Sequence, residues 1–179
     1  MSMDFPRRLW YNIFDRTLSS LKKAPKGQHQ LEENMFRIEK TTDLDTVREL
    51  FMEYSAIKGA EICFVSFQEE LEDLSAAYEG GAMFLAECDG APAGCVALKK
   101  IDQNCCEIKR LYLRPAFRGN GFSKIMLTKI LDEARQLGFR TATLSTLPAV
   151  MPEAFRLYQD YGFKTVYEED GIVDMELAI

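Results

Sequence analysis

The segment 107–124 constrains the fold of this chain more than any other stretch, because it joins two kinds of secondary structure through one turn. Residues 105–113 read as a β-strand, and residues 124–137 carry apolar side chains at the spacing of an amphipathic helix. Between them, Gly119 and Gly121 allow the backbone to adopt positive φ. A strand that runs through a glycine turn straight into a helix predicts a domain of the mixed α/β class.

The rest of the chain extends this mixed pattern. Further helices are predicted at 44–54, 67–78 and 152–161, and further strands at 36–39, 83–88, 93–99, 141–145, 163–167 and 174–177. Asp89-Gly90 is a hairpin turn signal, and Gly138 and Gly162 supply left-handed stops after two of the helices. The predicted element order from residue 36 is β-α-α-β-β-β-α-β-α-β-β.

Residues 1–34 are predicted to be a helical appendage and linker, separate from a domain that spans 35–179. The stretch 9–23 places its apolar side chains on one helical face, whereas 24–34 is polar and contains a proline and a glycine. This extra N-terminal helix could pack on the domain, on a second copy of the chain in a homodimer, or on a membrane surface. We favour packing on protein, because the cationic face of the helix is short.

Charge and cysteine usage narrow the choice of partner and compartment. A formal charge of -6 argues against nucleic acid, because phosphate contacts need clustered Lys and Arg, and it is compatible with a cationic amine substrate. No apolar run approaches the ~20 residues that a membrane span requires. Five cysteines without a C-x-x-C pair indicate reduced thiols and a cytoplasmic protein. No metal site is expected, because Cys105-Cys106 has only one histidine, the distant His29, to join it.

The turn before the helix at 124–137 has the properties of an anion site. A helix N-terminus presents unpaired N–H groups and the positive end of the helix dipole, and Arg118 adds a permanent charge. Together they predict a site for a phosphate or pyrophosphate. The P-loop motif is absent, and Lys124 stands where a dinucleotide fingerprint needs its third glycine. The pattern R-x-x-G-x-[GA] fits Arg118, Gly121 and Ser123 with one substitution.

Two motifs carry a resemblance to a known family. They are Lys109-Arg-Leu-Tyr-Leu-Arg-Pro-Ala-Phe-Arg-Gly-Asn-Gly and Ala154-Phe-Arg-Leu-Tyr-Gln-Asp-Tyr-Gly-Phe, in that order and on the expected elements. With them, residues 35–179 resemble the GCN5-related N-acetyltransferase (GNAT) family. The resemblance implies a mixed, mostly antiparallel sheet flanked by helices, and an enzyme that uses acetyl-CoA without a metal.

The resemblance also implies roles for particular residues. The family's pyrophosphate turn and the strand end that pairs with the pantetheine arm match Arg118, Gly119, Asn120, Gly121, Phe122, Ser123, Leu111, Tyr112 and Leu113. Tyr158 matches the tyrosine that protonates the departing thiolate, and Glu107 matches the general base of some members. Other interpretations stay open, because Glu107 could simply pair with Lys109, and Tyr158 could belong to the core.

The expected activity is transfer of an acetyl group from acetyl-CoA to an amine of a small molecule or to an exposed amino group, by direct attack on the thioester. The alternatives are an acyl-CoA-binding sensor or interaction module without turnover, and a domain that the N-terminal helix tethers to a partner. The acceptor has no sequence signature. An acidic segment near the C-terminus favours a cationic acceptor, and its charged residues are Glu168, Glu169, Asp170 and Asp174.

Overall fold

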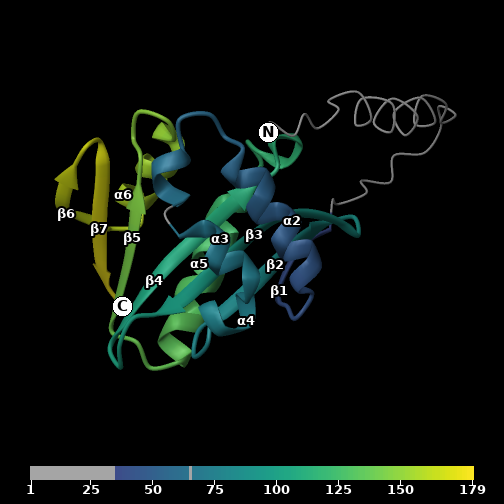
Figure 1. Cartoon of the computed structure of the whole chain (residues 1–179), viewed down its shortest axis with the longest axis horizontal. Helices are drawn as coiled ribbons and strands as arrows, with labels where there is room; N and C mark the ends of the chain where they lie inside the picture. Colours follow the sequence, from purple (N-terminus) through teal and green to yellow (C-terminus); the bar gives the residue numbers. More distant parts are fainter. Residues whose placement is uncertain (1–34, 65) are drawn as a thin grey trace, which may run out of the picture. The chain divides into compact units, whose positions relative to one another are not determined.

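The computed structural model describes residues 35–64 and 66–179 (Figure 1). The predicted helix at 9–23 and the linker at 24–34 lie outside the described residues. The helices are α2 (Leu44–Ser55), α3 (Phe67–Glu72), α4 (Leu74–Ala77), α5 (Phe122–Gln136) and α6 (Pro152–Asp160), with 3₁₀ helices η1 (Glu61–Phe64) and η2 (Pro115–Phe117). The strands are β1 (Phe36–Lys40), β2 (Ala82–Cys88), β3 (Ala91–Lys100), β4 (Cys105–Leu113), β5 (Thr141–Thr146), β6 (Lys164–Glu169) and β7 (Ile172–Ala178). None of the described helices is both long and apolar enough for a membrane span.

All seven strands form one sheet in the order β1-β2-β3-β4-β5-β7-β6. Neighbouring strands are antiparallel except β4 and β5, which run parallel and are connected through α5. Antiparallel neighbours need only tight turns, and Asp89-Gly90 between β2 and β3 has φ of 53° and 78°, as a primed hairpin turn requires. The predicted α/β class and mostly antiparallel sheet are confirmed.

Helices cover both faces of the sheet, and each face has its own apolar core (Figure 1). On one face, α5 and α6 bury side chains such as Met126 and Ile130 of α5 and Leu157 of α6 against Phe84 and Val96. The other face belongs to α2 and α4, with α3 packed beside them. The buried residues of that second core are Val47, Leu50, Phe51, Leu74, Tyr78, Met83, Cys95, Ala97 and Tyr112.

The prediction of a single helix at 67–78 is wrong, because the helix is interrupted at Asp73 and divides into α3 and α4. Asp73 has φ −141° and ψ 85°, outside helical geometry, and its carboxylate accepts a hydrogen bond from the N–H of Ala76 at 2.9 Å. An aspartate in this role caps a new helix instead of continuing the old one. The break allows Glu70 of α3 and Leu74 of α4 to be placed separately: Leu74 enters the core, and Glu70 faces Arg110 of β4.

Candidate functional site

The sheet opens between β4 and β5, and this opening positions the candidate site. The two strands pair through only residues 105–107 of β4, whereas β5 continues to Thr146 beside β7 and β4 continues to Leu113 beside β3. Beyond Glu107, therefore, one edge of β4 has no partner strand within the described residues. An extended ligand can add backbone hydrogen bonds to such an edge, as in strand addition.

A groove of ≈ 680 Å³ extends from the free edge of β4 to the start of α5, and we call it the β4–α5 groove. Strand, turn and helix α6 all contribute to its walls, so it is built from the two motifs that the sequence analysis singled out. Its lining includes Leu111, Tyr112, Leu113, Arg118, Gly119, Gly121, Ser123, Ala154 and Leu157. Seven of the nine residues expected to bind a cofactor therefore line one continuous surface.

The turn before α5 leaves several N–H groups without a partner. Within the part of the chain that the structure describes, the N–H groups of Gly119, Asn120 and Gly121 donate to no backbone carbonyl, and all three residues are exposed. The first N–H groups of α5 are free as well, as at any helix start. Gly121 caps the helix at φ 78°, a left-handed conformation that glycine adopts without strain. The arrangement suits an anionic group, which the helix dipole also favours.

Arg118 is tied to the end of β4. Its Nε donates to the carbonyl of Leu113 at 2.8 Å, and its guanidinium carbon lies 6.0 Å from the centre of the Tyr112 ring. The remaining guanidinium N–H groups stay available, since they make no other hydrogen bond among the described residues. A fixed arginine beside a helix N-terminus strengthens an anion site, because charged hydrogen bonds exceed neutral ones in strength.

The side chains of Asn120 and Phe122 serve the turn and the core and do not line the groove. Asn120 Nδ2 donates to the carbonyls of Phe117 at 3.2 Å and Arg118 at 3.4 Å, which stabilises the turn. The Phe122 ring stacks on Phe36 of β1 with centroids 4.0 Å apart. In the groove, these two residues offer a ligand their backbone N–H groups.

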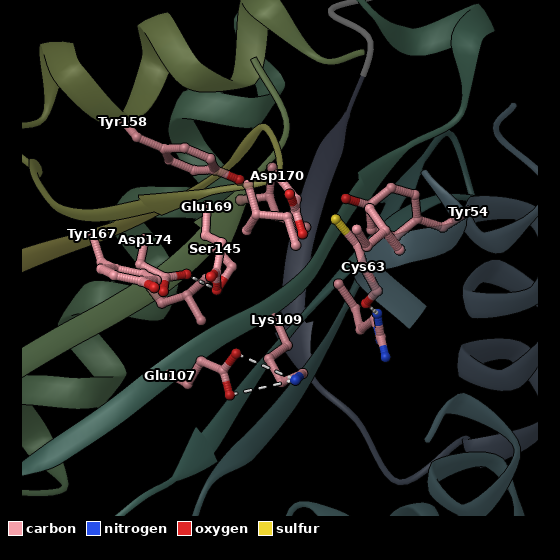
Figure 2. Close-up of a pocket in the computed structure, with 15 residues that line it drawn as sticks. Tyr54, Cys63, Glu107, Lys109, Ser145, Tyr158, Tyr167, Glu169, Asp170 and Asp174 are labelled. Atoms are coloured by element: carbon pink, nitrogen blue, oxygen red, sulfur yellow. Dashed lines mark hydrogen bonds and ion pairs between the residues drawn. The ribbon is translucent and has the colours of Figure 1, made fainter. Parts of the chain in front are cut away.

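Figure 2 shows a second cavity, of ≈ 310 Å³. It adjoins the groove, because Tyr54 and Leu111 line both spaces. We call it the β4–β7 cavity, because its walls come mainly from β4, η1 and the β6–β7 hairpin. Glu107 and Tyr158 both line it, although 51 positions separate them in the sequence. The structure thus brings the two expected catalytic residues to one space beside the end of the groove.

Glu107 is paired with Lys109 in this cavity. Lys109 Nζ lies 3.3 Å from Oε1 and 3.4 Å from Oε2 of Glu107, and both side chains are about one-quarter exposed (Figure 2). At these distances the pair is loose, since charged hydrogen bonds usually lie between about 2.7 and 2.9 Å. The pairing of Glu107 with Lys109, which the sequence analysis left open, is therefore present. The Glu107 carboxylate still faces the cavity.

Tyr158 enters the cavity from α6 and is buried. Burial, assisted by Tyr54 and Cys63, raises the pKa of its hydroxyl well above the ordinary value. Burial also raises the pKa of the neighbouring Tyr54 to about 12. Both hydroxyls therefore carry their protons at neutral pH.

The mouth of the β4–β7 cavity is acidic. Glu169, Asp170 and Asp174 line it, and Ser145 donates a hydrogen bond to Asp174 Oδ1 at 2.6 Å. Asp170 occupies the left-handed region at φ 51°, next to a glycine, so the hairpin turn presents its carboxylate (Figure 2). Glu168, the fourth acidic residue singled out in the sequence, lies outside this lining.

Sequence reasoning missed Arg110, a buried cation in the wall of the cavity. Its guanidinium forms a two-pronged ion pair with Glu70 of α3, with Nε 3.0 Å from Oε1, and Nη1 donates to the carbonyl of Cys63 at 3.2 Å. Burial alone would raise the pKa of Glu70, but hydrogen bonds from Arg110 and Tyr78 outweigh it and hold the pKa below its usual range. The sequence did contain a signal for this buried charge, because Arg110 stands where the alternation of the strand predicts an apolar residue.

Arg110 also has an unusual backbone. It lies at φ 56°, which costs a non-glycine residue roughly 1–2 kcal/mol. The β3–β4 register shifts here, so that Arg110 and Leu111 oppose the single residue Val96. This is a β-bulge, and bulges beside functional sites redirect the backbone.

Comparisons with known proteins agree with this geometry. The family described as "Acetyltransferase (GNAT) family" matches residues 44–163. An uncharacterized N-acetyltransferase of Schizosaccharomyces pombe, C1271.07c, is 35% identical over 69% of this chain and 77% of its own length. N-acetylaspartate synthetase of Xenopus tropicalis is 26% identical over 98% of this chain and 69% of its own. The PaiA N-acetyltransferase of Thermoplasma acidophilum, solved with coenzyme A, superimposes with a TM-score of 0.66 at 23% identity, over 81% of this chain and 99% of that one.

Proposed function

Because the chain belongs to the acetyltransferase (GNAT) family and is an N-acetyltransferase, we propose that it moves an acetyl group from acetyl-CoA to a cationic amine of a small molecule or an exposed amino group. One observation carries the proposal: the β4–α5 groove and the β4–β7 cavity meet at Tyr54 and Leu111. A donor held in the groove would present its reactive end to an acceptor held in the cavity. Proximity of this kind lowers the barrier to a two-substrate reaction.

The groove supplies the groups that acetyl-CoA needs. The N–H groups of the turn and Arg118 would hold the pyrophosphate, and the free edge of β4 at Leu111–Leu113 would pair with the pantetheine arm. Coenzyme A in the related Thermoplasma structure supports this choice of donor. A backbone N–H near Leu113 would donate to the thioester oxygen as negative charge develops on it.

The cavity supplies the proton transfers. Glu107 takes a proton from the protonated amine, directly or through water, and the freed nitrogen lone pair attacks the thioester carbonyl carbon. As the new C–N bond forms, the C–S bond breaks and Tyr158 gives its proton to the departing thiolate. The remaining excess proton on nitrogen leaves to solvent, Glu107 releases its proton to solvent and Tyr158 regains one from it. The enzyme is thereby restored, and the products are an amide, free coenzyme A and one proton.

The charge of the cavity mouth favours a cationic acceptor. Glu169, Asp170 and Asp174 line the cavity. Its two cationic lining residues are each paired, Lys109 with Glu107 and Arg110 with Glu70. An anionic amine such as aspartate, whose acetylated form gives the Xenopus relative its name, would meet net repulsion there. Spermidine and aspartate are therefore a useful pair of opposed test acceptors.

Calorimetric titration of acetyl-CoA into the wild-type protein and two variants tests the donor site. Gly121→Glu puts a carboxylate at the pyrophosphate turn, and Gly90→Glu is its matched control, because both glycines have φ 78° and open space where a Cβ would stand. Both variants should suffer similar backbone strain, but only Gly121→Glu should abolish saturable binding, by charge repulsion at the site. Equal binding by all three proteins, or none by a folded wild type, would contradict the proposed donor.

Thiol release with spermidine, lysine and aspartate then tests the acceptor class. We expect spermidine to give the largest kcat/KM and aspartate the smallest. The reverse order would refute a cationic acceptor while leaving the acetyl-CoA site intact. Binding of acetyl-CoA without thiol release in the presence of any of these amines would instead favour the non-catalytic acyl-CoA-binding module.

A further inference from the structure

Arg110 connects three parts of the molecule that the proposed reaction needs in one place. It belongs to β4, its guanidinium forms an ion pair with Glu70 of α3, and it donates a hydrogen bond to the carbonyl of Cys63 in η1. Its side chain is only 4% exposed. No proton transfer in the proposed reaction uses this arginine, so its buried charge calls for another role.

Aromatic rings hold the guanidinium from the sides. The Arg110 Cζ lies 4.4 Å from the ring centre of Phe64 and 5.1 Å from that of Phe67. Phe64 also packs edge-on against Tyr54, which lines both the groove and the cavity. Arginine suits such a position because its flat, weakly hydrated group stacks on rings and forms paired hydrogen bonds at once.

The other end of the same residue is the strained position of the β4 bulge. A bulge with a left-handed first residue usually has glycine there, whereas this chain has an arginine with a fully engaged side chain. The next residue, Leu111, lines both the groove and the cavity. Moving the guanidinium would therefore shift the β4 backbone at the junction of the two spaces, where the thioester would meet the acceptor.

We propose that Arg110 is a positioning residue, whose ion pair with Glu70 and bond to Cys63 lock the β4 bulge and the η1 wall of the β4–β7 cavity into one rigid unit. This inference rests on the proposed function, because it assigns the unit to aligning acceptor and thioester. A lysine cannot replace the arginine here, because an ammonium can satisfy Glu70 but lacks the fork that also spans to Cys63. Among the described residues, the anion turn at 118–123 makes no hydrogen bond or ion pair with Arg110, Glu70 or Cys63. The pyrophosphate contacts, and with them most of the donor affinity, should therefore not depend on this network.

The variant Arg110→Lys tests the proposal, with Arg48→Lys as its matched control. Arg48 of α2 also donates to α3, at the carbonyl of Leu71, but among the described residues it makes no hydrogen bond or ion pair with β4. With spermidine as acceptor, Arg110→Lys should lower kcat about tenfold and raise the acceptor KM several-fold, because small misalignments of reacting groups are costly. The Kd for acetyl-CoA should change by no more than about twofold, and Arg48→Lys should leave all three values within about twofold.

Hydrogen exchange supplies a readout that needs no substrate. Arg110→Lys should speed amide exchange in peptides that cover η1 and residues 107–113, while residues 122–136 keep their wild-type protection. If Arg110→Lys does not fold, Glu70→Gln, which keeps the shape of the partner and removes its charge, should give the same pattern.

Unchanged kcat, or donor affinity that falls as much as kcat, would overturn the positioning role. Failure of the proposed function looks different, because wild-type protein would then release no thiol from acetyl-CoA. In that case the hydrogen-exchange pattern still decides whether Arg110 locks the bulge to η1.

Discussion

The donor end and the acceptor end of the site are built in different ways. At the donor end, the groups expected to hold the ligand belong to a strand, a turn and a helix that follow one another within residues 105–136, and they are mainly backbone N–H groups. The acceptor end combines residues of α2, η1, β4, β5, α6 and the β6–β7 hairpin, and its polar groups are side chains. Most substitutions leave the backbone N–H groups in place, whereas a single substitution removes the polar group of a side chain.

This difference explains why the donor end can be predicted from the sequence and the acceptor end cannot. A site made from local backbone requires a sequence motif, because the turn needs glycine and the helix has to begin at a fixed place after it. A site made from distant side chains can change its acceptor without disturbing the fold. Changes at the donor end should therefore alter acetyl-CoA affinity alone, and changes at the acceptor end should alter acceptor kinetics alone.

Tyr158 lines the β4–β7 cavity beside the end of the groove, and its removal should have the largest effect. Tyr158→Phe should lower kcat about 100-fold with little change in the Kd for acetyl-CoA, because it removes the proton donor for the thiolate. Since burial raises the pKa of Tyr158, the wild-type kcat should show no loss from its ionisation below about pH 10. Stopped-flow thiol release across pH measures both.

Tyr161→Phe is the matched control for this prediction. It makes the same change one turn later, at a hydroxyl that bonds the Lys124 carbonyl at 2.8 Å and Thr128 at 2.7 Å and lines neither space. We expect its kcat to stay within about twofold of wild type. Equal losses in the two variants would mean that Tyr158 acts through packing.

Arg118→Ala should weaken donor binding and spare the acceptor. Loss of a charged hydrogen bond is worth about 1.5–3 kcal/mol, so the Kd for acetyl-CoA should rise at least about tenfold, and less so in high salt. Arg135→Ala, at the exposed far end of α5, is the control and should leave the Kd unchanged. A rise in the spermidine KM alone would break the separation of the two ends.

Glu169→Gln should act on the acceptor alone, and more weakly. An exposed charge contributes about 0.2–1 kcal/mol, so the KM for spermidine should rise about threefold, while aspartate becomes a slightly better substrate. Glu168→Gln removes the same charge one residue earlier, outside the cavity lining, and should change neither. Matching effects of the two variants would show that only net charge matters, not the shape of the cavity mouth.

The donor end could be predicted from the sequence because its determinants are close together. The strand at 105–113, the positive φ of Gly119 and Gly121, and the helix behind them all follow from local patterns. Membership of the GNAT family, inferred from the motifs around that turn and around Tyr158, is confirmed. The roles of individual residues in binding and catalysis stay predictions.

The acceptor end could not be predicted in the same way. The bulge at Arg110 is stabilised by Glu70, 40 positions earlier, and no local pattern encodes that pairing. The break at Asp73, which sets Glu70 apart from the core residue Leu74, was hidden by apolar spacing that suits one continuous helix. Which acidic residues face the cavity depends on a register shift between β6 and β7, and tertiary pairing fixes that register.

The smallest predicted effect concerns acid stability at the acceptor end. The pKa of Glu70 is lower in the folded state than the ~4.3 of a free glutamate, so the unfolded chain binds more protons as pH falls. The stabilisation from the Arg110–Glu70 pair is therefore complete above about pH 5 and is lost as pH falls through the lowered folded pKa. The gap in melting temperature between wild type and Glu70→Gln, measured by circular dichroism, should narrow on acidification. Glu69→Gln, the neighbouring residue without an ion pair among the described residues, should show no such pH-dependent gap. A gap that stays constant with pH would mean that Glu70 stabilises α3 by shape and hydrogen bonding, and that its charge is not what fixes the acceptor wall to β4.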